Sequence, residues 1–250
     1  MVAYVETRHG PLAYTTVGRG RPFVLLHGNT YSAATQVRLA QRFTDDYTVY
    51  CPDLLGHGHS ARPTGLFSLR YFALQGEALA DLLETLFPFA AVPVFGMSAG
   101  GITALNAICL APERIAALIL DGVFMEVSPA MVAAHRRSTA AMSRTWHRYM
   151  REQHGDDWWP LLNQGIEATV GLLEHAGTLV APCLEQITVP TLIYQGGRDP
   201  FVPDAQAYAI AQAIVGARLH YVAEAEHLVA WRDPAAFREQ VRAFLQDHGL

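Results

Sequence analysis

Short apolar runs alternate with amphipathic segments of helical length along most of the chain. Five runs have the length and composition of buried strands: 23–26, 48–51, 92–95, 117–120 and 191–194. Glycine, proline or aspartate follows each run within two residues. Between the runs, apolar residues recur at helical spacing, most clearly in 71–87 and 237–245. This alternation predicts an α/β fold, in which helices cover both faces of a doubly wound, mostly parallel sheet.

Two segments depart from the alternation. The runs 3–7 and 12–16 flank Gly10-Pro11, which predicts an antiparallel hairpin at the edge of the sheet. Residues 124–186 contain no convincing strand, and they hold four of the six methionines and three of the four tryptophans. We therefore expect a core formed by residues 1–123 and 187–250, with residues 124–186 inserted as a small helical cap over the strand ends.

The pentapeptide Gly96-Met97-Ser98-Ala99-Gly100 directly follows the run 92–95 and precedes a helical pattern. A serine on a tight turn from strand to helix projects its hydroxyl above the sheet, where it can react. The strained backbone of such a turn needs small neighbours, and the glycines and Ala99 meet this need. We interpret Ser98 as a nucleophile rather than as a serine that only caps the following helix.

A serine nucleophile needs a base, and the base needs a carboxylate that orients it. Asp199 stands in a Gly-rich loop directly after the run 191–194, and His227 follows a short run that ends at Val222. Asp121 also follows a strand and is a rival for the acid, while Asp199 has the alternative role of a helix cap. We favour Asp199 as the acid and His227 as the base.

Four motifs in this order resemble the α/β-hydrolase superfamily, and the resemblance covers nearly the whole chain. The motifs are His27-Gly28 after the first parallel strand, the segment from Asp53 to Ser60, the turn around Ser98, and the paired Asp199 and His227 segments. The order Ser, Asp, His along the chain is that of the superfamily.

The resemblance implies a catalytic triad of Ser98, His227 and Asp199, with an oxyanion hole formed by the backbone N–H groups of Asn29 and Ala99. It also implies a cap that selects the substrate, and a mechanism that needs no metal and no organic cofactor. The expected reaction is hydrolysis of a small or medium carboxylic ester, thioester or lactone through an acyl-enzyme on Ser98.

Two alternatives stay open. One is an enol-lactone or acyl-lactone hydrolase, and the other is a hydrolase-like receptor that turns over its small-molecule ligand slowly. Dehalogenase-like relatives use an aspartate nucleophile, often followed by tryptophan, so the pair Ser98-Ala99 makes dehalogenation and epoxide hydrolysis poor alternatives.

The predicted cap contains an apolar stripe at helical spacing. Met142, Trp146 and Met150 belong to this stripe, and they are candidates for the substrate pocket, although a packing face of the cap explains the same pattern. Four arginines, Arg137, Arg144, Arg148 and Arg151, fall on the other face of what reads as the same helix. We expect that face to be solvated, and the alternative is a site for a carboxylate-bearing substrate, which would favour a lactone.

The composition excludes some classes of partner. Hydrophobic residues make up 51% of the 250 residues and the net charge is −5, which is typical of a globular protein without a nucleic-acid footprint. No run of uncharged apolar residues is long enough for a membrane span, and no signal-peptide pattern is present, so we expect a cytoplasmic protein that acts on a small molecule. Cys51, Cys109 and Cys183 are odd in number and widely spaced, which favours reduced thiols over disulfides or a metal site.

Overall fold

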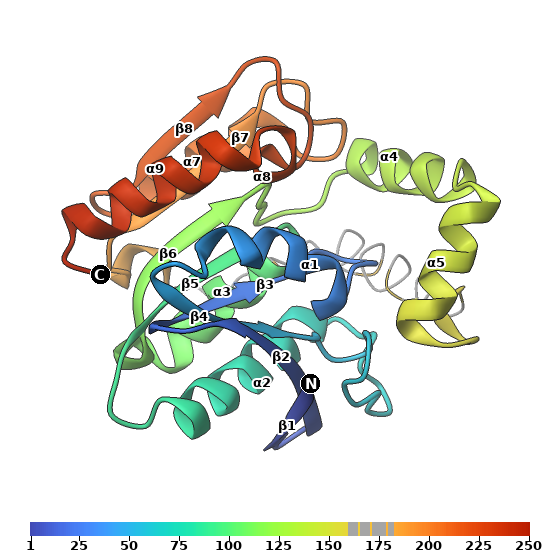
Figure 1. The fold of residues 1–250 in the computed structure, drawn as a ribbon. Coiled ribbons are helices and arrows are strands. Elements are labelled where there is room, and N and C mark those ends of the chain that lie inside the picture. Colours follow the sequence, from blue (N-terminus) through green and yellow to red (C-terminus); the bar gives the residue numbers. More distant parts are fainter. Residues whose placement is uncertain (160–164, 166–170, 172–178, 180–182) are drawn as a thin grey trace.

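A single eight-stranded sheet organises the molecule in the computed structural model, which describes residues 1–159, 165, 171, 179 and 183–250 (Figure 1). The strand order is β1-β2-β4-β3-β5-β6-β7-β8. The strands are β1 (Val2–Thr7), β2 (Gly10–Gly18), β3 (Arg21–Leu26), β4 (Tyr47–Pro52), β5 (Val92–Met97), β6 (Ile115–Asp121), β7 (Thr191–Gly196) and β8 (Arg218–Val222).

The pairing of the strands confirms the predicted α/β class. β1 and β2 form the expected antiparallel hairpin, and β2 then pairs antiparallel with β4. All pairs from β4 through β3, β5, β6 and β7 to β8 are parallel. Because parallel strands share one direction, the loops after β3, β5, β6, β7 and β8 meet at the same edge of the sheet.

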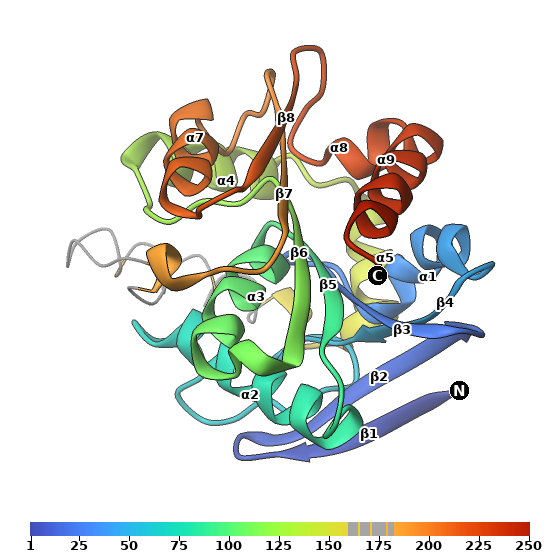
Figure 2. The same cartoon turned by 90° about the vertical axis from the view of Figure 1, so that its left-hand side faces the viewer.

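Helices cover both faces of the sheet, as Figure 2 shows. One face packs against α2 (Tyr71–Leu86), α3 (Ala99–Leu110) and α7 (Asp204–Ala213), and the other against α1 (Ala33–Ala40), α8 (Val229–Arg232) and α9 (Pro234–Asp247). Successive side chains of β5 feed the two cores in turn: Val94 belongs to one core and Phe95 to the other. This double burial explains why the central strands read as continuous apolar runs.

The remaining described helices are short or lie beyond the sheet. Three single turns are η1 (Gln41–Phe43), η2 (Pro112–Arg114) and η3 (Leu184–Gln186). The helices α4 (Pro129–Ala140) and α5 (Arg144–His154) extend past the carboxyl ends of the strands (Figure 1). Within the predicted cap, the described residues form α4, α5 and η3 and contain no strand, whereas 160–164, 166–170, 172–178 and 180–182 lie outside the described residues.

The segment of the cap that the sequence pattern predicted to be one helix forms two helices. α4 ends at Ala140, and the side chain of Ser143 accepts a hydrogen bond from the N–H of Trp146 and so caps the start of α5. Met142 therefore stands in the connection between the helices, and Arg137 lies on a different helix from Arg144. The spacing of the apolar residues continued across this break, which is why the pattern alone suggested a single helix.

The prediction of three reduced cysteines is wrong. Cys109, near the end of α3, forms a disulfide with Cys183, and the two Cα atoms are 5.8 Å apart although 74 residues separate them in sequence. Only Cys51 is free, and it is buried. The spacing of the cysteines along the chain could not indicate this pairing, because only the fold brings the two residues together. The predicted cytoplasmic location loses this part of its support.

None of the described helices combines the length and apolar character that a membrane crossing requires.

Candidate active site

Ser98 occupies the turn between β5 and α3, with a positive φ of 48°. Its N–H donates to the carbonyl of Asp121 over 2.8 Å, and its own carbonyl accepts from the N–H of Ile102. A side chain at Gly96 would lie 2.5 Å from the carbonyl oxygen of Gly100, so only glycine permits the strand and helix to approach this closely. The turn thus holds a strained serine at the carboxyl end of a central strand.

His227 and Asp199 come together from the loops after β8 and β7. The Nδ1 atom of His227 lies 2.7 Å from Oδ2 of Asp199, whose side chain is fully buried. The other carboxylate oxygen, Oδ1, accepts hydrogen bonds from the N–H groups of Phe201 and Val202. Because a carboxylate oxygen accepts hydrogen bonds, Nδ1 of His227 carries a proton in this contact, and Nε2 is the ring nitrogen directed away from Asp199.

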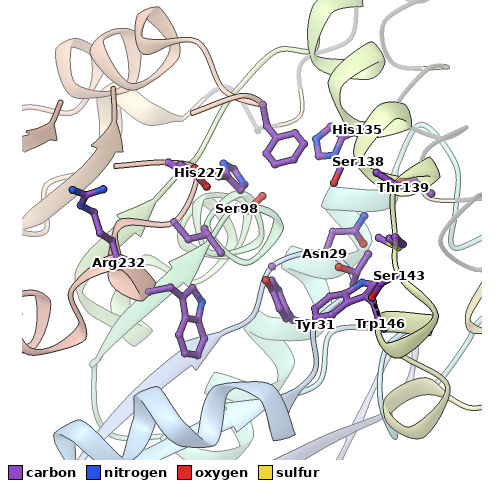
Figure 3. Close-up of a pocket in the computed structure, with 18 residues that line it drawn as sticks. Asn29, Tyr31, Ser98, His135, Ser138, Thr139, Ser143, Trp146, His227 and Arg232 are labelled. Carbon is purple, nitrogen blue, oxygen red and sulfur yellow. Dashed lines mark hydrogen bonds between the residues drawn. The ribbon is translucent and has the colours of Figure 1, made fainter. Parts of the chain in front are cut away.

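Gly122 provides the space for His227 directly after β6. Its φ is +63°, and a Cβ atom there would lie 3.0 Å from Cε1 of His227 and 2.6 Å from its carbonyl oxygen. The imidazole therefore packs against bare backbone at the end of β6. Ser98 and His227 line the same cavity, and Figure 3 shows both side chains there.

Asp121, the rival acid, holds a different group. Its carboxylate accepts hydrogen bonds from the N–H groups of Val229 and Ala230, at the start of α8. Complete burial raises the pKa of Asp121 to about 7, against the opposing effect of these two donors. Asp121 thus anchors the segment that follows His227, and the carboxylate in contact with the imidazole is that of Asp199.

Ala99 and Asn29 lie on either side of the turn at Ser98. Ala99 is the first residue of α3, and the first N–H groups of a helix have no partner within it. Asn29 follows β3, in a loop that His27 holds: Nδ1 of His27 donates to the carbonyl of Gly28, and Nε2 accepts from the N–H of Leu54. Burial lowers the pKa of His27 to about 3, so the ring stays neutral and structural.

The amide of Asn29 is held from behind by a second buried histidine. Nε2 of His57 lies 3.1 Å from Oδ1 of Asn29. Burial is the main cause that keeps the pKa of His57 well below its usual range, followed by the nearby rings of His27 and His154. Nδ1 of the same ring lies 3.1 Å from the carbonyl oxygen of Leu55 and so carries the proton of the neutral imidazole, which makes Nε2 an acceptor. The backbone N–H is therefore the donor that Asn29 offers a bound molecule.

A cavity of about 780 Å³ opens above Ser98, and its described lining is mixed polar and aromatic (Figure 3). Trp146 and Met142, two of the candidates for the substrate pocket, line it. Met150 does not: it is fully buried beside Trp158 and lines a separate small cavity behind Asn29. Met150 lies one turn further along α5 than Trp146, where it packs against Trp158.

A second, smaller cavity also borders Ser98. Besides Ser98, Ala99 and Asn29, it is lined by Tyr71, Phe72, Phe124, Val132, His135 and Gly165. Most of these side chains are apolar and buried. Ser98 therefore borders both a large, mixed cavity and a small apolar one.

Sequence reasoning missed the polar residues that α4 presents to the large cavity. His135, Ser138 and Thr139 share one helix face, at spacings of three and four, and that spacing was the available signal. His135 stacks on Phe201, with ring centres 4.7 Å apart, and Phe201 contacts the ring of His227. Burial lowers the pKa of His135 to about 4, so this imidazole is neutral at pH 7.

The predicted arginine face is exposed and lies outside the cavity. Arg137, Arg144, Arg148 and Arg151 are all exposed, and Arg151 pairs with Asp156. Among the described residues of the cavity lining, the arginine is Arg232, at the end of α8. The described part of the chain contains no group of three His, Cys, Asp or Glu side chains arranged to hold a metal ion.

Comparison with known proteins finds the same fold in hydrolases of ester bonds. A family model described as the alpha/beta hydrolase fold matches residues 21–158. The human serine hydrolase BPHL is 28% identical over 204 residues, 80% of this chain and 70% of that protein. The 3-oxoadipate enol-lactonase 2 of Acinetobacter baylyi is 26% identical over 94% of this chain and 93% of that protein.

A solved structure adds to this likeness at the level of the fold. The esterase EaEST of Exiguobacterium antarcticum superimposes with a TM-score of 0.74 at 20% identity, over 98% of this chain and all of that one. The family match spans more than half of the 250 residues. The chain belongs to the α/β-hydrolase family and is a hydrolase.

Proposed function

We propose that this protein hydrolyses a carboxylic ester of a small molecule through an acyl-enzyme formed on Ser98. The observation that carries the proposal is the 2.7 Å contact between Asp199 and His227 in the cavity that also contains the strained Ser98. Nucleophile, base and orienting acid come from three different loops at one edge of the sheet. The stability of the fold alone does not require these three side chains to lie together.

The reaction follows from the positions of the protons. Nε2 of His227 takes the proton of Ser98 as Oγ attacks the ester carbonyl, and Asp199 stabilises the imidazolium. The N–H groups of Ala99 and Asn29 stabilise the oxyanion, a contribution of about 2.7–4 kcal/mol for each donor in comparable sites. His227 then returns the proton to the alcohol oxygen as the bond to the acyl carbon breaks. Water, activated by the same base, releases the acid from Ser98.

The two cavities suggest how a substrate lies. The leaving oxygen must receive its proton from His227, and His227 lines the large cavity but not the small one. The alcohol part therefore occupies the large cavity, beside Ser138, Thr139 and Asn29, and the acyl group enters the small apolar cavity beside Phe72 and Val132. We expect esters with short acyl groups and polar alcohols to be the better substrates.

A lactone is the second candidate. The enol-lactonase relative from Acinetobacter favours it, and so does Arg232 at the wall of the large cavity, where a carboxylate could pair with a guanidinium. The arginines of α4 and α5, which had suggested a lactone from sequence, give no support because they lie outside the cavity.

Steady-state hydrolysis of p-nitrophenyl esters from acetyl to octanoyl tests the proposal. We expect turnover with a preference for the shorter acyl groups, and Ser98→Ala should lose at least about 10³-fold in kcat, as loss of a nucleophile does in comparable triads. His227→Ala should lose a similar factor, and the double variant should lose little more. Wild-type rates in Ser98→Ala would overturn the assignment of the nucleophile.

An organophosphonate probe separates an enzyme from a receptor. Labelling of Ser98, located by mass spectrometry of the peptide, together with multiple turnovers, supports the esterase. One rapid turnover followed by near-complete arrest would instead indicate a receptor that hydrolyses its ligand slowly. Faster turnover of lactones than of linear esters would select the second candidate.

A further inference from the structure

The cap helix α5 ends on a histidine that is buried against the core. His154 is the last residue of α5, and only 6% of its surface is exposed. Its Nδ1 accepts a hydrogen bond from the N–H of Gly58 over 2.8 Å, so that nitrogen carries no proton. The proton is therefore on Nε2, which donates to the carbonyl oxygen of Thr30 over 3.0 Å. Burial lowers the pKa of His154, in keeping with a neutral ring that bridges two loops.

Thr30 is the residue in this loop that most needs an anchor. Its φ is +68°, and among the described residues Thr30 and Ser98 are the non-glycine residues with a positive φ. It is the third residue of the turn closed by the N–H of Tyr31 and the carbonyl of Gly28, a position that normally takes glycine or asparagine when φ is positive. A β-branched side chain makes this conformation costly, so surrounding contacts must maintain it.

The same end of α5 contacts the core at several more points. Ser32, just after the turn, donates to Oε1 of Gln153 over 2.7 Å. The guanidinium of Arg62 donates to the carbonyl of His154 and pairs with Asp157 at 3.5 Å. The ring of His57, which holds the amide of Asn29, packs edge-on against His154. The cap is thus attached to the core at the loop that contains Asn29.

We propose that His154 is a positioning residue: its Nε2–H holds Thr30 in the strained turn and thereby keeps the backbone N–H of Asn29 directed at the oxyanion. This inference rests on the proposed function, because the oxyanion hole matters only if Ser98 attacks a carbonyl. It also makes the cap a part of the catalytic geometry, since the anchor comes from α5. An oxyanion donor acts in the transition state, so a displaced turn lowers kcat and leaves KM nearly unchanged.

Two amide substitutions separate the hydrogen bonds of His154. In His154→Gln the side-chain nitrogen reaches the position of Nε2 and still donates to Thr30, but no acceptor faces Gly58. In His154→Asn the side-chain oxygen occupies the position of Nδ1 and still accepts from Gly58, but no donor reaches Thr30. Both variants replace an aromatic ring by an amide, so each controls for the loss of packing.

We expect kcat for p-nitrophenyl acetate to fall by about 10- to 100-fold in His154→Asn, part of the effect of losing one oxyanion donor, and by less than about threefold in His154→Gln. KM should stay within about twofold in both. Equal losses in the two variants, or a loss confined to KM, would overturn the proposal. Circular dichroism on heating shows whether each variant is folded.

A Thr30→Gly background gives an independent check, because glycine adopts the positive φ without an anchor. There, His154→Asn should cost less than about threefold in kcat relative to Thr30→Gly alone, and an undiminished loss would contradict the anchoring role. A crystal structure of His154→Asn provides a readout that does not depend on catalysis. Negative φ at Thr30 supports the inference even if Ser98 proves inactive, and an unchanged turn overturns it.

Discussion

At the scale of single residues, two buried aspartates at neighbouring strand ends have different surroundings. Asp199 faces an imidazole and two backbone N–H groups, and Asp121 faces two backbone N–H groups at the start of α8. Both are close to His227 in the fold, but only the carboxylate of Asp199 lies within hydrogen-bonding distance of its ring. The geometry therefore favours Asp199 as the candidate for the orienting acid and gives Asp121 the position of an anchor.

This difference predicts unequal effects of the two isosteric variants. Asp199→Asn should lower kcat by about 10³–10⁴-fold, because an amide that donates to Nδ1 selects the wrong imidazole tautomer. Asp121→Asn should cost less than about tenfold, since it weakens only the anchor of the loop after His227. Steady-state kinetics of both variants on one p-nitrophenyl ester is the measurement. The reverse order would transfer the acid to Asp121.

His27 predicts a pH dependence of stability. Its pKa is about 3 in the folded protein and about 6.5 in the unfolded chain, so the unfolded chain binds the extra proton first as the pH falls. The contribution of His27 is complete above pH 6.5 and is lost as the pH falls toward 3, at about 1.4 kcal/mol per pH unit. Urea unfolding from pH 7 to pH 4 should show the stability advantage of the wild type over His27→Gln shrinking. A constant difference would contradict a neutral buried ring.

At the scale of elements, the contact between α2 and α3 holds the helix that begins at Ser98. Gly76 of α2 faces Asn106 of α3, and a Cβ atom at Gly76 would lie 2.5 Å from Cβ of Asn106. Asn106 cannot easily move, because its amide donates to the carbonyls of Ile102 and Leu179. The close approach of the two helices therefore depends on the missing side chain.

Gly76→Ala should consequently destabilise the fold, against the gain in helix propensity that alanine normally brings. We expect a loss of about 1–3 kcal/mol in the free energy of unfolding, the usual cost of overpacking. Thr85→Ala, at an exposed position of the same helix, serves as the control and should change stability by less than about 0.5 kcal/mol. Urea denaturation measures both, and a stabilised Gly76→Ala would refute the close packing.

At the scale of the whole molecule, the disulfide between Cys109 and Cys183 closes a loop that contains β6, α4 and α5. It connects the end of α3 with the segment that re-enters the core before η3. The helix that carries Ser98 at its start is thus covalently linked, at its other end, to the end of the predicted cap. Cross-linking a chain over such a distance restricts mainly its unfolded state.

Reduction should therefore lower the stability of the protein by about 2–4 kcal/mol, the range typical of disulfides that close long loops. Thermal unfolding with and without dithiothreitol measures the effect, and Cys183→Ser should unfold like the reduced protein in either condition. Cys51→Ala removes the free buried thiol and should keep the full response to reduction. A wild-type protein indifferent to dithiothreitol, with free thiols at Cys109 and Cys183, would contradict the link.

The sequence alone determined the features that depend on neighbours along the chain. Buried parallel strands read as apolar runs because both faces are covered, and the turn at Ser98 has a local glycine signature. The segments of Asp199 and His227 follow strands whose ends must meet in any parallel sheet. The fold class was therefore predictable, and so was the set of loops that contribute to the candidate site.

Only the tertiary structure decided the features that depend on distant contacts. Contacts between residues far apart in sequence place Asp199 against the ring of His227 and bring Cys109 and Cys183 together. Such contacts also bury Met150 away from the large cavity. The hydrogen bond from His154 to Thr30 spans 124 residues. Hydrogen bonds and packing act over a few ångströms in space. The periodicity and spacing of residues along the chain therefore cannot indicate which distant residues the fold brings into contact.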